Sequence, residues 1–102
     1  MRRDVYQAIA DPTRRQIIGM LVNTPLNLKT VTENFDVSRP TISKHIKVLT
    51  ECGVVVIKQQ GRERFCYANR EKLNEVKHWL EQLDAMWDNK LNALKNFIEN
   101  EE

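Results

Sequence analysis

The chain has few of the features that mark secreted or membrane proteins. Its 102 residues include only two cysteines, three glycines and three prolines, and no run of about 18 apolar residues could span a bilayer. The initial segment MRRDVYQAIADPTRR is charged and lacks the apolar centre of an export signal. These absences exclude a disulfide-rich or membrane-spanning chain. They predict a cytoplasmic protein in which Cys52 and Cys66 stay reduced.

The sequence also lacks the motifs of the common enzyme classes. It contains no Gly-rich phosphate loop, nucleophile elbow or pair of candidate catalytic carboxylates, and neither His45 nor His78 has an evident nucleophile partner. We therefore expect no catalytic activity and no cofactor.

Positive charge is concentrated in the first part of the chain. Residues 1–70 carry twelve Lys and Arg against six Asp and Glu, a net charge of +6, whereas residues 71–102 carry four against eight, a net charge of −4. A basic region of this kind suits an anionic partner such as double-stranded DNA, and the acidic tail does not.

Helical periodicity and stop signals predict an α+β fold that is mainly α. Asp11 and Pro12 should start one helix, Ser38 should cap another, and Gly53 should end it. β-branched residues, a turn near Gly61 and an aromatic return strand predict a two-stranded hairpin. We expect a single domain over residues 1–102, with helices over 3–10, 12–22, 29–36, 39–52 and 70–99 and a hairpin over 54–68.

The segment SRPTISKHIKVLTECG resembles a helix that reads DNA. On a helical wheel Ile42, Ile46 and Leu49 share one face, and the opposite face is basic, with its only acid, Glu51, at the far end. His45 lies on the border and would either touch DNA or hydrogen-bond within the turn. The outward residues suit base edges and phosphates; they are Arg39, Thr41, Ser43, Lys44 and Lys47.

A helix-turn-helix over residues 29–53 would be followed by a basic hairpin over 54–68. Lys58, Arg62 and Arg64 flank the turn of that hairpin. A basic hairpin directly after a recognition helix is typical of the wing of a winged helix, which touches phosphates or the adjacent minor groove. Two basic elements therefore predict the same partner.

Two motifs, AIADPTRRQIIGML and VSRPTISKHIKVLTECGVVVIKQQGRERFCY, resemble the arsenical-resistance-repressor (ArsR) family of bacterial winged-helix regulators over about residues 5–68. The resemblance implies a homodimeric repressor of a palindromic operator, with the first and last helices at the dimer interface. The family's DNA-binding motif matches Ser38, Arg39, Thr41, Ser43, Lys44 and His45, and its wing matches Arg62 and Arg64. The expected dimer contacts are Val5, Ile9, Leu80, Leu83, Trp87, Leu91 and Leu94.

The chain departs from the family pattern at two places. Asp36 stands where the family often has Gly in the turn, and Asp tolerates a left-handed backbone well enough for the turn to survive. The helix KTVTENFDVS has no Cys or His, so the chain resembles the branch without the cysteine metal-sensing motif, and we expect no metal site. The family's other metal site would have to use His78, Glu81 and Asp84.

Several alternatives remain open at this point. The exposed face of the fourth helix could bind a protein instead of DNA, although the charge asymmetry speaks against it. A repressor gated by metal, or by oxidation of Cys52 and Cys66, is a third class. Trp79 and Trp87 would lie in a dimer or domain core, or beside a small-molecule pocket between the last helices.

Overall fold

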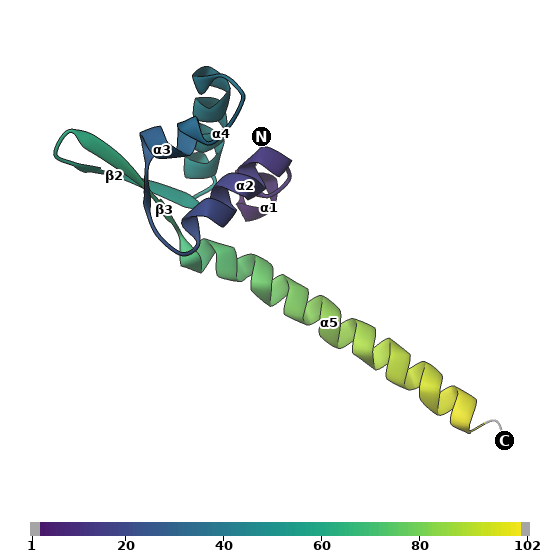
Figure 1. The fold of residues 1–102 in the computed structure, drawn as a ribbon. Coiled ribbons are helices and arrows are strands. Elements are labelled where there is room, and N and C mark those ends of the chain that lie inside the picture. The colour runs from purple at the N-terminus through teal and green to yellow at the C-terminus, as the bar shows by residue number, and fades with distance from the viewer. Residues whose placement is uncertain (1–2, 101–102) are drawn as a thin grey trace.

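A computed structural model describes residues 3–100; residues 1–2 and 101–102, the ends of the predicted domain, lie outside it. Within this range a body of short helices and a small sheet carries one long helix that projects from it (Figure 1). The elements in chain order are α1 (Val5–Ala8), α2 (Pro12–Leu21), β1 (Leu26–Asn27), α3 (Leu28–Glu33), α4 (Arg39–Glu51), β2 (Val55–Gln60), β3 (Glu63–Ala68) and α5 (Arg70–Glu99).

Asp and Asn side chains cap the starts of the helices, because the first backbone N–H groups of a helix have no partner within it. The Asp11 carboxylate accepts from the backbone N–H of Arg14 at 3.1 Å, and Pro12 occupies the first turn of α2 as predicted. The Asn69 side chain does the same for α5, accepting from the N–H of Glu71 at 3.1 Å. These local signals explain why the starts of α2 and α5 were predictable.

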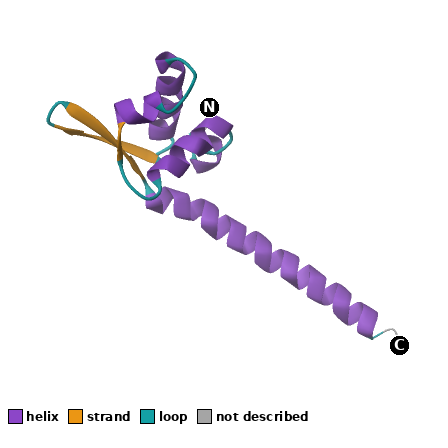
Figure 2. Ribbon diagram, viewed as in Figure 1, coloured by secondary structure: helices purple, strands orange, loops and turns teal. Residues whose placement is uncertain are grey.

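The wing belongs to a three-stranded antiparallel sheet with strand order β1-β3-β2 (Figure 2). The β2–β3 hairpin turns at Gly61, whose φ of 64° lies in the left-handed region that glycine enters without strain. The predicted two-stranded wing therefore gains a third strand. Leu26 and Asn27 of β1 pair with Cys66 and Phe65 of β3.

The core of the body lies between α2, α3, α4 and the sheet. Ile42, Ile46 and Leu49 of α4 are all buried, as the helical wheel predicts. They pack with buried side chains of the other elements, namely Val5, Ala8, Ile17, Ile18, Leu21, Val31, Cys52, Val54, Val55 and Cys66. Burial of each large aliphatic side chain contributes roughly 1.5–3 kcal/mol, so this cluster fixes the inner face of α4 and leaves its outer face to solvent.

The helix α5 packs on the body only through its first turns. Leu73 and Val76 lie against the core, and the rings of Tyr6 and Trp79 meet edge to face with centroids 5.7 Å apart. Beyond Trp79 the helix continues as an unbroken rod away from the body (Figure 1). The described chain is therefore elongated, with extents of 72 × 28 × 25 Å.

Some local predictions were wrong in detail. The first and third helices are shorter than expected, spanning Val5–Ala8 and Leu28–Glu33. Ser38 is at the N-cap of α4, but its hydroxyl bonds to the Thr41 hydroxyl at 2.9 Å and caps no backbone N–H. Asp36 needs no left-handed backbone, because within residues 3–100 only glycines have positive φ. None of the helices over that span is long and apolar enough to traverse a bilayer.

Candidate nucleic-acid interface

The outer face of α4 carries the residues predicted to touch DNA. Ile42, Ile46 and Leu49 point inward and so turn the polar side chains outward. Within residues 3–100 no carboxylate forms an ion pair with the basic side chains of this face. The exposed predicted residues are Ser38, Arg39, Thr41, Ser43, Lys44 and Lys47.

His45 differs from the other predicted residues because it faces α2. Its Nδ1 atom lies 3.4 Å from Nη1 of Arg14 and 3.8 Å from the Asp11 carboxylate. Its side chain is only 21% exposed. The intramolecular contact of His45 is therefore with α2, and not within the turn as one of the two predictions had it.

Arg14 links three helices at this point. Its Nε donates to the carbonyl of Ala8 at 3.0 Å, Nη2 donates to the carbonyl of Gln7 at 2.9 Å, and Nη1 faces His45. The two carbonyls are at the end of α1, and His45 is in the middle of α4. One guanidinium group therefore braces α1 and α4 against α2, and we call Asp11, Arg14 and His45 the α2–α4 brace.

Burial by itself would raise the pKa of Asp11, but the hydrogen bond from the Arg14 backbone and the charge of His45 outweigh it and lower the pKa below the ordinary 3.8. A carboxylate with a lowered pKa adds stability above its ordinary pKa, and this is lost as the pH falls through the lowered value. The stability of the wild type should therefore drop relative to Asp11→Asn as the pH falls from about 5 through the lowered pKa.

Urea unfolding at several pH values tests this expectation. Asn caps a helix about as well as Asp but does not titrate, and every other carboxylate is common to both proteins. The difference between the two unfolding free energies therefore isolates Asp11. Parallel pH profiles would contradict the interaction of the Asp11 carboxylate with Arg14 and His45.

The wing presents Arg62 and Arg64 to solvent on either side of Glu63. Lys58 on β2 lies over the Tyr67 ring, with its Nζ 5.0 Å from the ring centroid. Gln60 donates to the Tyr67 hydroxyl at 2.9 Å. These cross-strand contacts stabilise the hairpin. In the described part of the chain, neither Arg62 nor Arg64 has a carboxylate partner.

Two adjoining hollows separate α4 from the wing. One of about 410 Å³ reaches from Arg39 to the hairpin turn, and one of about 230 Å³ continues beside Lys47. Leu28, Ser43 and Arg64 line both, so we call the pair the α4–wing trough. One basic residue of its wall, Lys29 of α3, is not among the predicted DNA contacts, because the sequence of that helix predicts only packing and the lack of metal ligands.

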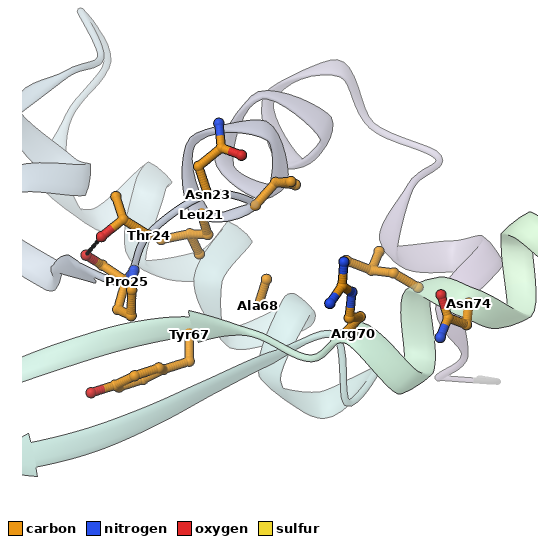
Figure 3. A pocket seen from close by; sticks show the side chains of 10 residues that line it. Leu21, Asn23, Thr24, Pro25, Tyr67, Ala68, Arg70 and Asn74 are labelled. Carbon is orange, nitrogen blue, oxygen red and sulfur yellow. Dashed lines mark hydrogen bonds between the residues drawn. The ribbon is translucent and has the colours of Figure 1, made fainter.

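A separate hollow of about 490 Å³ shares no lining residue with the trough. Figure 3 shows it between the end of α2, strand β3 and the start of α5. Leu21 of α2 and Arg70 of α5 both line it. It is not between the last helices, where a small-molecule pocket was considered.

The long helix α5 leaves an apolar stripe exposed. The side chains of Leu83, Trp87 and Leu91 are 40%, 63% and 48% exposed. Val5, predicted as a dimer contact, has no exposed surface and belongs to the core, while Ile9 is half-buried against it. The stripe as a whole comprises Trp79, Leu80, Leu83, Met86, Trp87, Leu91, Leu94, Phe97 and Ile98.

Both cysteines are buried, Cys52 at the end of α4 and Cys66 on β3. Burial raises the pKa of each thiol above its ordinary value of 9.0. The thiolate is the reactive form, so this environment disfavours a redox switch. Over residues 3–100, no three His, Cys, Asp or Glu side chains gather as metal ligands would.

Comparisons with known proteins point to one group. A general model of the helix-turn-helix domain matches residues 9–57. The transcriptional repressor SdpR of Bacillus subtilis is 30% identical over 88 residues, which cover 86% of this chain and 98% of SdpR. The HTH-type transcriptional regulator Rv2034 of Mycobacterium tuberculosis is 31% identical over 96 residues, which cover 94% of this chain and 87% of Rv2034.

The similar solved structures are also those of transcriptional regulators. An ArsR-like transcriptional regulator from Rhodococcus sp. RHA1 superposes with a TM-score of 0.74 at 33% identity, covering 91% of this chain and 88% of that one. A second ArsR family transcriptional regulator gives a TM-score of 0.72 at 35% identity, covering 81% and 86% of the two chains. The similarity therefore extends beyond the helix-turn-helix to most of the fold.

Proposed function

The chain belongs to the ArsR family of helix-turn-helix transcriptional regulators, and from that premise we propose that it represses transcription by occupying an inverted-repeat operator as a homodimer. It is a DNA-binding regulator and not an enzyme. The proposal has α4 in the major groove, the wing at the adjacent backbone or minor groove, and the cytoplasm as the compartment.

The observation that carries this proposal is the asymmetry of α4. One face is fully packed by Ile42 and Leu49, which are each 0% exposed, and the other offers Arg39, Lys44 and Lys47 with no carboxylate partner in the described chain. A solvated helix face usually mixes acids among its bases. An unneutralised basic face beside a basic wing instead fits the phosphates and base edges of DNA.

The stripe on α5 supports the homodimer. An apolar stripe on a projecting helix is costly in water, and packing against a second copy would remove it from solvent. We drop Val5 from the predicted contacts because it is buried. We retain the half-buried Ile9 and the exposed Leu80, Leu83, Trp87, Leu91 and Leu94. A two-fold dimer would present two copies of α4 to half-sites about 34 Å apart, so the operator should be an inverted repeat.

Two substitutions on α4 should separate base reading from phosphate binding. Arg39→Ala removes a guanidinium that can fork to guanine and should reduce discrimination against a mismatched half-site by about 1–3 kcal/mol. Lys47→Ala removes a point charge and should weaken all duplexes by a similar factor. The measurement is a mobility shift with fragments of the promoter of the protein's own gene, first mapped by footprinting.

The outcome also discriminates between partner classes. If the wild type shifts no DNA at low salt, or if neither substitution changes DNA binding, α4 is not the DNA-reading helix. That outcome would favour the alternative in which the exposed face of α4 binds a protein. A steep fall of affinity with salt is expected for the wild type, because each phosphate contact releases counterions.

A further inference from the structure

The α4–wing trough suggests a DNA contact that neither the recognition helix nor the wing provides. Its walls come from α3, α4 and the hairpin. One acid, Glu63, lines it against five cations, and none of these has a carboxylate partner within residues 3–100. The cations are Lys29, Arg39, Lys47, Arg62 and Arg64. A trough so charged fits a chain of anions.

The geometry of B-DNA identifies the chain of anions that would lie in the trough. The major and minor grooves of a duplex are separated by a sugar-phosphate backbone. If α4 lies in the major groove and the wing reaches the neighbouring minor groove, the backbone strand between those grooves must pass between α4 and the wing. That space is the trough.

We infer that the trough seats one strand of the operator backbone and that Lys29 of α3 binds a phosphate of that strand. The inference rests on the proposed function and adds a contact outside α4 and the wing, the two elements that the proposed function places on DNA. Lys29 is exposed in the first turn of α3, at the end of the trough that also holds Arg39.

Lys29 is held in place relative to the wing. The Asn27 side chain caps α3 by accepting from the backbone N–H of Lys29 at 2.9 Å. Asn27 also pairs with Phe65 of β3, next to Arg64. The start of α3 is therefore tied to a wing strand through β1, so a phosphate between Lys29 and Arg64 would meet a preformed site.

Salt dependence measures the Lys29 contact directly. Lys29→Gln should reduce the slope of log K against log salt concentration by about 0.9. If the two proteins have equal affinity at 1 M salt, the variant therefore binds roughly eightfold more weakly than the wild type at 0.1 M salt. The loss should be equal for the footprinted operator and for a duplex with one mismatched half-site. Lys29→Arg should restore the slope. Lys77→Gln, which removes an equal charge from α5, should leave it unchanged.

A second measurement locates the phosphate. Single phosphates of the operator are replaced in turn by uncharged methylphosphonates along the strand between the α4 major groove and the wing minor groove. At one position the methylphosphonate should weaken binding of the wild type but cause no further loss of affinity in Lys29→Gln, which already lacks that contact. A wild-type slope for Lys29→Gln, or additive losses at every position, would overturn the inference and leave the proposed function standing. A wild type that binds no DNA would overturn both.

Discussion

Replacing Leu91 by Glu should turn the protein into a monomer and weaken operator binding by about a hundredfold or more, because a monomer offers one recognition helix and half of the phosphate contacts. Leu91 lies in the middle of the stripe and is 48% exposed. In a two-fold dimer each substitution occurs twice, so two carboxylates would enter one apolar interface. An unpaired charge in such surroundings costs several kcal/mol.

The chain provides a matched control on the same helix. Asn89→Glu adds the same charge two residues away, about 200° round the helix and so on the face opposite the stripe. This variant should stay dimeric and bind the operator as the wild type does. Sedimentation equilibrium reports the oligomeric state, and mobility shifts report affinity. A dimeric Leu91→Glu protein with unchanged affinity would show that the stripe is not the interface.

Much of the fold was predictable from local signals. The bounds of α4 follow from Ser38 and Gly53 at its ends, and those of α5 from the apolar spacing within it. The predicted helix over 70–99 coincides with α5 because no Gly or Pro interrupts it. The inward face of α4 was likewise predictable, since a period of 3.6 residues assigns each side chain to a face.

Contacts between distant segments were not predictable in the same way. The strand β1 is two residues long and has no periodicity of its own; it exists because it pairs with β3, some forty residues later. The partners of His45 are Asp11 and Arg14, which belong to a different helix. Propensity and spacing describe neighbours along the chain, so they could not decide between the two roles of His45.

The basic trough shows the same limit at the candidate site. Arg39, Lys47, Arg62 and Arg64 were predicted individually, but their arrangement round one hollow depends on how the hairpin packs beside α4. The position of Lys29 was itself a signal, because the first helix of a helix-turn-helix crosses the DNA backbone and a basic side chain in its first turn would lie near a phosphate.

Replacing Arg14 by Met should destabilise the protein by about 3 kcal/mol, since hydrogen bonds of a charged group contribute roughly 1.5–3 kcal/mol when buried and less when partly exposed. The substitution keeps the aliphatic stem but removes the donors to Gln7, Ala8 and His45. Two carbonyls at the end of α1 then lose their partner. Urea unfolding followed by circular dichroism measures the change in free energy.

Arg15→Met is the control for this prediction. The neighbouring Arg15 makes one hydrogen bond, from Nη1 to the carbonyl of Ile9 at 2.8 Å, and it is exposed. Its loss should cost about 1 kcal/mol or less. His45→Ala combined with Arg14→Met should cost less than the sum of the two single losses, because the residues share one contact. Equal effects of Arg14→Met and Arg15→Met would mean that the α2–α4 brace does not hold the recognition helix, and the orientation of α4 would then depend on its apolar face alone.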